Sequence, residues 1–492
     1  MKFEQFKEFA KSYNLIPVYK VITADMLTPV LAYLKIRKPG TQSFLLESVE
    51  GSANMARFSF IGIAPEKIIS NIGIKLSEKS NGHQQTKDES IFSFIKKEIK
   101  RQKQPKIDSL PGFTGGLVGF LGYENISHIE KVITFNSYDS SIPDSIFGNY
   151  KTILVFDHYK HQIILISNAA IKPETNIETA YQSALNNIER LRKELAAPKY
   201  FLSDFKLDEK LNNDFNTDEF FTQVEKSKTH ISEGDIFQIV LSKRFSAGFT
   251  GDAFNVYRAL RIINPSPYMY FLEFEHDYKI IGTSPEDLVR VNDKQARTLP
   301  IAGTRRRGKT EEEDLLLEEE LKNDPKELAE HTMLVDLGRN DLGRVCKYGT
   351  INVTDKMKIV KYSHVMHMVS KVAGELLDDK DAVDALMACF PAGTVSGAPK
   401  IKAVELIEKY EKLRRNIYAG AVGYFDFSGN MDMCIAIRTL YTQGNKIYWQ
   451  AGAGIVADSR PELEVKEIKN KSAAMVKALK YAEVIDENNS NR

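Results

Sequence analysis

The sequence predicts an α+β fold on three observations. The chain has 492 residues, of which 42% are apolar, enough for a large core built from two or more packing units. Strand-like runs and helical stretches follow one another in mixed order, whereas a doubly wound parallel sheet requires regular alternation. A glycine-rich run at residues 112–122 indicates strands or turns whose backbones pack closely. This run lacks Gly-x-Gly-x-x-Gly spacing between a strand and a helix, which argues against dinucleotide binding there.

Charge and cysteine content exclude several classes of function. The formal net charge is +1, so no overall field favours nucleic acid or an anionic membrane. No apolar run is long enough to span a bilayer, and the charged helix expected at the amino terminus lacks the apolar core of a signal peptide. Cys346, Cys389 and Cys434 form no Cys-x-x-Cys pair, which argues against a disulfide scaffold or a zinc site. We therefore expect a protein of the reducing cytoplasm.

The first 200 residues form one expected unit. Apolar runs predict strands at residues 43–46, 152–156 and 162–166, and residues 182–196 have a helical pattern. The polar segment 78–88 is expected to be an exposed loop or turn. Residues 198–215 are charged and rich in asparagine, which makes them the best linker candidate. These patterns place a boundary between a unit at 1–200 and a second unit at 217–482.

The second unit has clear helix signals. A helix is expected from Thr217 to Gly234, and an acidic helix begins at Thr310 with a capping box. Asp324 and Pro325 start another helix, because aspartate caps the amino end and proline suits the first helical position. Further helices begin near Pro399 and Pro461. Strands are expected at residues 236–241, 269–274, 279–282, 419–425, 433–440 and 446–451.

Two acidic pairs are the most informative feature of these helices. Glu327 and Glu330 lie in the first turns of one helix, and Glu464 and Glu467 lie in the first turns of another. Residues three apart on a helix share a face, so each pair presents two carboxylates in one direction. Taken alone, such spacing usually marks a solvated helix face. If the fold brings the pairs together, they form an all-oxygen site of the kind that holds Mg²⁺ with an anionic substrate.

Six stretches, in order along the chain, resemble one known family. They are residues 298–304 (TLPIAGT), 330–341 (EHTMLVDLGRND), 363–367 (SHVMH), 390–400 (FPAGTVSGAPK), 420–424 (GAVGY) and 450–454 (QAGAG). They resemble the large, chorismate-using subunit of anthranilate synthase, within the chorismate-binding enzyme superfamily. The resemblance implies large mixed or antiparallel sheets packed as a sandwich with surrounding helices. It also implies a regulatory domain at 1–200 and a catalytic domain at 217–482.

The same resemblance implies an activity. Enzymes of this type are lyases that convert chorismate and ammonia to anthranilate and pyruvate in tryptophan biosynthesis, with Mg²⁺ and with feedback inhibition by tryptophan. Isochorismate-forming members have a lysine where this chain has Gln238, and the usual aminodeoxychorismate synthases have one where it has Ala302. Neither replacement can act as the base or the covalent nucleophile that those lysines provide. Anthranilate formation with ammonia as nucleophile is therefore the expected reaction.

The implied catalytic site contains residues of three kinds. Glu330 and Glu467 would bind Mg²⁺ directly, with Glu327 and Glu464 acting through water or local charge. His367 would assist loss of the C4 hydroxyl, with Thr394 near the ring; His364, three residues earlier, is the competing histidine. Residues 434–438 are expected to form a strand on which Arg438 is either a carboxylate clamp or a buried salt-bridge partner, and the resemblance favours the clamp. The remaining implied substrate-binding residues are Tyr418, Gly282, Ala302, Gly303 and the turn Gly452, Ala453 and Gly454, whose N–H groups would face a carboxylate.

A regulatory site and a partner are implied as well. The segment ending in Glu47 and Ser48, and the segment Pro267, Tyr268 and Met269, resemble the two halves of a tryptophan site. None of the three cysteines has the nucleophile context of a glutamine amidotransferase. Ammonia would therefore come from a separate amidotransferase subunit or from solution.

Three other interpretations stay open at this stage. Aminodeoxychorismate synthase component I is the first, because some of its members lack the lysine. A catalytically inactive, tryptophan-binding regulatory protein is the second. A di-iron carboxylate protein is the third, although that site requires Glu-x-x-His, and both acidic pairs here are Glu-x-x-Glu.

Overall fold

The structure is a computed structural model that describes residues 1–492 except 49–56, 136–141, 214, 363–364 and 488–492. Its strands form two twelve-stranded sheets in which the paired strands run antiparallel. The first sheet has the order β1 (Leu15–Thr23), β10 (Gln162–Ala170), β9 (Thr152–Asp157), β3 (Phe58–Ile63), β2 (Ser43–Glu47), β13 (Tyr268–Glu273), β14 (Lys279–Ser284), β23 (Thr439–Gln443), β24 (Lys446–Ile455), β12 (Gln238–Gly251) and β11 (Phe205–Asn213), with β20 (Gly397–Ala398) beside β12.

The second sheet is built in the same way. Its order is β17 (Ile301–Arg306), β19 (Val365–Glu375), β16 (Gln295–Thr298), β15 (Asp287–Asn292), β22 (Met431–Ile435), β21 (Ala421–Asp426), β7 (Gly116–Leu121), β8 (Ser145–Tyr150), β4 (Lys67–Ile72), β5 (Lys75–Ser80) and β6 (His83–Asp88), with β18 (Asn352–Lys361) beside β19. Buried residues of both sheets, among them Phe44, Phe120, Tyr270 and Val422, pack together as one core. The predicted sandwich of large sheets is therefore confirmed.

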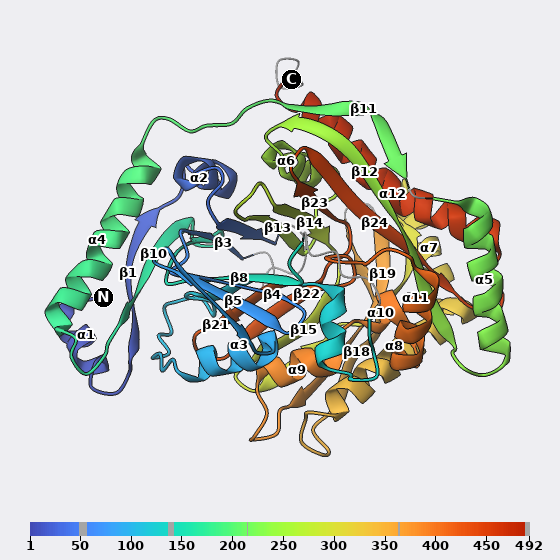
Figure 1. Ribbon diagram of the computed structural model, residues 1–492, viewed down its shortest axis with the longest axis horizontal. Coiled ribbons are helices and arrows are strands. Elements are labelled where there is room, and N and C mark those ends of the chain that lie inside the picture. Colours follow the sequence, from blue (N-terminus) through green and yellow to red (C-terminus); the bar gives the residue numbers. More distant parts are fainter. Residues whose placement is uncertain (49–56, 136–141, 214, 363–364, 488–492) are drawn as a thin grey trace.

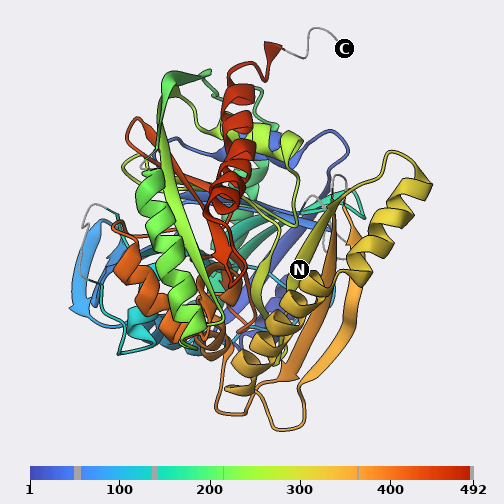
Figure 2. The same ribbon diagram turned by 90° about the vertical axis from the view of Figure 1, so that its right-hand side faces the viewer.

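Helices cover the outer faces of the sandwich. The first sheet carries α1 (Phe3–Phe9), α2 (Pro29–Ile36), α4 (Ile177–Ala196), α6 (Phe254–Ile263) and α12 (Pro461–Glu483). The second carries α3 (Ile91–Lys100), α8 (Pro325–Gly343) and α9 (Ala382–Cys389). The remaining helices are α5 (Thr217–Ser232), α7 (Glu311–Asn323), α10 (Gly393–Ser396), α11 (Lys400–Tyr410) and the 3₁₀ turn at Tyr123–His128. In Figure 1, α4 runs along the left edge and α5 along the right; Figure 2 shows α5 and α7 on opposite sides.

The two expected units share both sheets. Strand β2 pairs with β13, and β7 pairs with β21, so strands from the first 200 residues lie beside strands from the second unit. The boundary near residue 200 therefore does not separate two independently packed sheets. The regulatory and catalytic roles of the two segments stay predictions.

Two local expectations were wrong. Residues 78–88, expected as a loop, belong to the β5–β6 hairpin, whose polar side chains face solvent on an edge of the second sheet. The expected linker at 198–215 contains β11, which pairs with β12 through a bulge between Leu207 and Leu211. Tertiary pairing overrides a polar composition in both cases, because an edge strand needs few apolar side chains.

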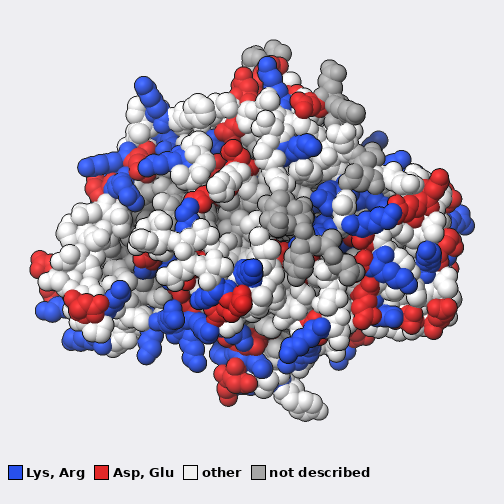
Figure 3. Space-filling view, in the orientation of Figure 1, with Lys and Arg blue, Asp and Glu red and all other residues white. Residues whose placement is uncertain are grey.

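The surface agrees with the near-zero net charge. On the face shown in Figure 3, lysine and arginine alternate with aspartate and glutamate, and neither sign forms a continuous field. No helix in the part of the chain that the structure describes is long and apolar enough to cross a bilayer.

Candidate active site

One cavity of about 270 Å³ collects most of the predicted catalytic residues. Strands β12 and β24 form one wall, and the amino-terminal turns of α8 and α12, together with the segments after β14 and β22, form the others. The predicted residues that line it are Gln238, Glu330, Thr394, Tyr418, Arg438, Gly452, Gly454, Glu464 and Glu467. Residues more than 200 positions apart thus meet at one place.

The two acidic helices face each other across this cavity. Asp324 caps α8 by accepting hydrogen bonds from two backbone N–H groups, and proline stands in the first turn of both helices, as predicted. Burial raises the pKa of Glu330, and the nearby charges of Glu327 and Glu467 raise it further. Burial also raises the pKa of Glu464, and the charge of Glu467 adds to the rise. Carboxylates of both helices therefore repel one another within one cavity.

Lys471 partly neutralises this acidic group. Its Nζ lies 2.6 Å from Oε1 of Glu467 and donates a hydrogen bond of 3.0 Å to the carbonyl of Gly452. Lys326 also lines the cavity, and its charge lowers the pKa of Glu330. Glu327 lies outside the lining and pairs with Arg305 at 3.1 Å. The role of Glu327 in the site, through water or local charge, stays a prediction.

The donor set fits Mg²⁺. Four glutamates line the cavity, and carboxylate oxygens are the ligands that this cation prefers. The mutual repulsion that raises the pKa of Glu330 and Glu464 would be relieved by a divalent cation between the helices. Within the described residues, these glutamates do not form a cluster of three with all ligand atoms within 4.8 Å of one another. Glu467 instead pairs with Lys471.

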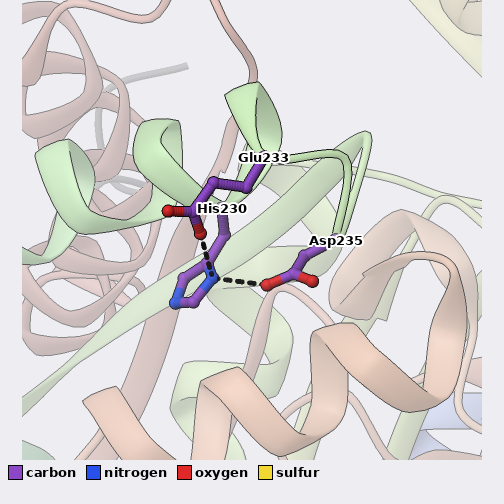
Figure 4. A group of neighbouring side chains, drawn as sticks. All are labelled: His230, Glu233 and Asp235. Carbon is purple, nitrogen blue, oxygen red and sulfur yellow. Dashed lines mark hydrogen bonds and ion pairs between the residues drawn. The ribbon is translucent and has the colours of Figure 1, made fainter.

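The cluster that does meet this distance lies elsewhere. His230, Glu233 and Asp235 gather at the carboxyl end of α5 (Figure 4), and Nδ1 of His230 lies 2.7 Å from Oδ2 of Asp235. The N–H of Asp235 also donates to the carbonyl of His230 at 2.9 Å. These contacts close the end of a helix, and none of the three side chains lines the 270 Å³ cavity.

Arg438 lines the cavity, although not from a strand. Strand β22 ends at Ile435 and β23 begins at Thr439, so Arg438 lies in the turn between them with a φ of 51°. The expected strand at 434–438 was wrong, because the chain turns there to pass from one sheet to the other. Burial lowers the pKa of Arg438, and its guanidinium forms no ion pair with any described residue. An unpaired, half-buried guanidinium lining a cavity favours a carboxylate clamp over a structural salt bridge.

The two glycines lie in a strand and leave room for side chains. Gly452 and Gly454 belong to β24 and pair with β12, so the predicted turn was wrong. A Cβ on Gly452 would lie 2.6 Å from the hydroxyl of Tyr418, and one on Gly454 would lie 2.6 Å from Nε2 of Gln238. Glycine at these two positions therefore leaves room for the ends of the Tyr418 and Gln238 side chains. Ala453, between the glycines, is fully buried in a separate apolar core.

Glu286 is a cavity residue that the sequence reasoning missed. It lies two residues after the end of β14 and lines the cavity together with Thr394. Burial raises the pKa of Glu286 to about 8, and the Thr394 hydroxyl offsets part of the rise. A single glutamate in a turn carries no periodicity and no spacing signal, so only its place in the fold reveals it.

His367 lies beside the cavity and not in its lining. On β19, its Nδ1 is 3.0 Å from the Thr304 hydroxyl and 3.2 Å from the carbonyl of Gly303. Burial lowers the pKa of His367, and the charge of Arg438 lowers it further. Ala302 and Gly303 on β17 and Gly282 on β14 are also absent from the lining. His364 lies outside the described residues.

The five predicted effector residues line a separate pocket of about 180 Å³. These residues, Glu47, Ser48, Pro267, Tyr268 and Met269, come from β2 and β13 and the residues next to them, which pair in the first sheet. Arg261 donates a 3.1 Å hydrogen bond to Glu47, and the Tyr268 hydroxyl donates one of 2.9 Å to Asp432. Aromatic side chains complete the walls, namely Phe58, Phe60, Phe113 and Tyr424. The pocket thus combines an acid with an aromatic lining.

The fold is a sandwich of two sheets with one cavity. Two acidic helices, a half-buried arginine and a tyrosine surround that cavity. The family model for chorismate binding enzymes matches residues 42–477, and the chain belongs to that family. It is similar to anthranilate synthase component 1 from Acetivibrio thermocellus, with 45% identity over 97% of this chain and 98% of the relative. The component 1 from Acinetobacter calcoaceticus is 44% identical over 98% of each chain.

A solved structure shows the same likeness. The crystal structure of anthranilate synthase component I from Streptococcus pneumoniae matches with a TM-score of 0.77 and 39% identity, over 92% of this chain and 98% of that one. The resemblance inferred from six short stretches therefore extends over nearly the whole chain, including the first 200 residues that those stretches do not cover.

Proposed function

We propose that this chain converts chorismate and ammonia to anthranilate and pyruvate, the reaction of its component 1 relatives. The observation that carries the proposal is the cavity in which glutamates from α8 and α12 face Arg438 and Tyr418. Chorismate has two carboxylates, one on the ring and one on the enolpyruvyl ether. A cavity with a cation site at one end and a guanidinium at the other suits such a molecule.

Substrate binding divides between these two ends. Arg438 and the Tyr418 hydroxyl would hold the enolpyruvyl carboxylate. Glu330 and Glu467 would hold Mg²⁺, which when bound neutralises the ring carboxylate and draws electron density from the ring. Glu467 must exchange its contact with Lys471 to take this role, because the two groups now pair at 2.6 Å. Metal and substrate are therefore expected to bind more tightly together than alone.

Proton donation to the departing hydroxyl falls to Glu286 in this proposal. A carboxyl group with a pKa of about 8 is mostly protonated at neutral pH, so it can supply the proton. His367 has a lowered pKa and is neutral there. We therefore assign His367 to orienting the groups around the leaving hydroxyl, with Thr394 beside Glu286. Gln238 lines the cavity where a water-activating lysine would stand, which supports ammonia as the nucleophile.

An amidotransferase partner would supply the ammonia. All three cysteines are free and buried, and burial raises the pKa of each thiol, to about 11 for Cys346. Such thiols are poor nucleophiles, so this chain is not expected to release ammonia from glutamine. Free, buried thiols also support the expected cytoplasmic location.

Tryptophan is the proposed ligand of the second pocket. Glu47 would bind the ammonium group by exchanging one of its bonds from Arg261 and Tyr257, and the aromatic walls are suited to an indole ring. A pocket of about 180 Å³ suits one amino acid of this size. Inhibition would follow if bound tryptophan favours an arrangement in which the catalytic cavity cannot close on chorismate.

Product analysis tests the proposal. The purified chain is incubated with chorismate, MgCl₂ and ammonium chloride, with and without tryptophan, and the products are identified by mass spectrometry against standards. We expect 2-aminobenzoate and pyruvate in equal amounts, with less of both when tryptophan is present. Formation of 4-aminobenzoate would replace the proposal with aminodeoxychorismate synthesis. Glutamine in place of ammonium should give no product unless an amidotransferase is added.

A further inference from the structure

A second, smaller hollow of about 50 Å³ adjoins the catalytic cavity. The two share Glu286 and Thr394, so the same carboxyl group faces both spaces. Apolar side chains from α8 and the strands around it, among them Leu288 and Leu334, form much of its wall. The hollow therefore gives Glu286 a second neighbouring space, apart from the cavity that would hold substrate.

Three residues that line this hollow, Asp287, Thr298 and Thr394, have a buried polar atom without a partner among the described residues. Oδ1 of Asp287 accepts a 2.8 Å hydrogen bond from the N–H of Leu299, but its Oδ2 is buried without a partner among the described residues. The hydroxyl of Thr298 is likewise buried and unpartnered in that part of the chain. Both residues line the hollow and are less than one-tenth exposed. Buried polar atoms are rarely left unpaired, which points to ordered water at this place.

The size of the hollow allows such water. A water molecule needs about 15 Å³ when volume is counted in this way, so a hollow of about 50 Å³ has room for about three. Each water also needs two or more polar partners, and Asp287, Thr298, Glu286 and Thr394 supply them. Water here would connect the three unpartnered atoms with the carboxyl group of Glu286.

We propose that Asp287 and Thr298 hold a short water chain that returns a proton to Glu286 in each catalytic cycle. The proposal rests on the proposed function, because it concerns the proton that Glu286 gives to the C4 hydroxyl. Asp287 is a positioning and relay residue here, since it touches neither substrate nor metal.

The proton balance is closed. The O–H bond of the Glu286 carboxyl breaks, its proton goes to the C4 oxygen, and the C4–O bond breaks to release water. A water in the hollow then gives a proton to the Glu286 carboxylate and takes one from the carboxyl group of Asp287. Ammonia adds to the ring as a positively charged nitrogen, which releases one proton to solvent, and Asp287 recovers a proton from solvent. No oxidant or reductant is needed, and the turnover takes up no net proton.

The charges around Asp287 suit a proton exchange near neutral pH. Burial raises the pKa of Asp287 to about 7, close to the value of about 8 for Glu286, so transfer between them is nearly balanced. Arg290 and Arg297 lower the pKa of Asp287, whereas the charge of Asp432 on β22 raises it. The other titratable and charged groups at the hollow and its wall are Asp341 on α8, its ion-pair partner Lys400 at 2.9 Å, and Cys389 on α9.

A purely structural role for Asp287 is the competing explanation. The bond from Leu299 fixes the loop between β16 and β17, and an aspartate could be present for that bond alone. The variant Asp287→Asn separates the two roles. Its amide oxygen can still accept from Leu299, but the side chain cannot release a proton to water.

The experiment measures kcat and KM for chorismate between pH 6 and 9, with ammonium chloride as nitrogen donor. We expect Asp287→Asn to lower kcat about tenfold to a hundredfold and to leave KM within about twofold, because a relay acts on the chemical step. The descending limb of the pH profile should also shift, because removing the Asp287 charge lowers the pKa of Glu286. Thr298→Val should lower kcat about threefold to tenfold, whereas Thr298→Ser, which keeps the hydroxyl, should restore it.

Three results would overturn the proposal. One is an Asp287→Asn variant with unchanged kcat and pH profile. Another is a loss of kcat with an unchanged pH profile, which would mark a structural role. The third is equal activity of Thr298→Val and Thr298→Ser, a matched pair that remains informative if Asp287→Asn unfolds.

A measurement without turnover separates this proposal from the proposed function. Difference infrared spectroscopy can titrate the Glu286 carboxyl band in the substrate-free protein, assigned with Glu286→Gln. We expect the pKa of Glu286 to fall in Asp287→Asn, whether or not the wild-type protein makes anthranilate. An unchanged Glu286 titration would refute the coupling, whereas a wild-type protein that makes no anthranilate would refute only the function.

Discussion

The change Glu286→Gln should stabilise the fold above neutral pH while it removes catalysis. The folded state raises the pKa of Glu286 from 4.5 to about 8, because burial disfavours the charged form. An acid with a raised folded pKa makes the fold most stable below its unfolded pKa, and this stability is lost as the pH rises from 4.5 towards 8. Glutamine has the same shape and never ionises, so it should avoid the loss.

The magnitude follows from the size of that shift. A change from 4.5 to about 8 corresponds to an upper bound of about 5 kcal/mol, since one pKa unit equals about 1.4 kcal/mol. Relaxation around a cavity-facing carboxyl group reduces this, and we expect about 2 kcal/mol at pH 8.5. For a chain of 492 residues, this corresponds to a rise in Tm of about 2 °C.

The assay is thermal unfolding of both proteins at pH 5 and pH 8.5. Glu286→Gln should exceed the wild-type Tm at pH 8.5 and equal it at pH 5, where the wild-type carboxyl is already protonated. Its kcat for anthranilate should fall about a hundredfold or more at pH 7.5. A Tm that is lower than wild type by the same amount at both pH values would refute the reasoning, because it would show that Glu286 is not held in the uncharged form by burial.

Three further predictions concern the other parts of the two pockets. Lys471→Met should raise the affinity for Mg²⁺ in the absence of chorismate about threefold to tenfold, because it removes the cation paired with Glu467. Isothermal titration calorimetry measures this affinity, and weaker Mg²⁺ binding by the variant would contradict the prediction. Arg438→Lys should raise KM for chorismate about tenfold to a hundredfold and leave Tm nearly unchanged, since an ammonium group cannot form the paired bonds of a guanidinium. Steady-state kinetics measures this, and an unchanged KM would refute the assignment of Arg438 as a carboxylate clamp. Ser48→Phe should fill part of the 180 Å³ pocket and relieve tryptophan inhibition with near-normal kcat, and an unchanged inhibition curve would remove the effector assignment.

Local signals in the sequence predict the helices that carry the acidic groups. Asp324 and Pro325 place the start of α8, and Pro461 places the start of α12, because capping depends on residues within one turn. The spacing of Glu464 and Glu467 then places both carboxylates on one face. These features need no knowledge of distant contacts.

Other features depend on pairing between distant segments. Strand β11 and the β5–β6 hairpin are polar, and their pairing partners determine their structure. Glu286 has a raised pKa because of its place in the turn that follows β14, which lines one cavity together with α10 and α12. Arg438 was predicted as a clamp by resemblance, but its position in a turn between the two sheets follows from the topology. No periodicity in the sequence indicates the position of Glu286 or that of Arg438.

The most direct test of the account is metal binding by Glu330→Gln and Glu467→Gln, measured together with Mg²⁺-dependent turnover of chorismate. Both variants should keep the wild-type Tm, bind Mg²⁺ at least about tenfold more weakly in the presence of chorismate, and form no measurable anthranilate. Wild-type turnover in either variant would contradict the claim that α8 and α12 hold one cation between them.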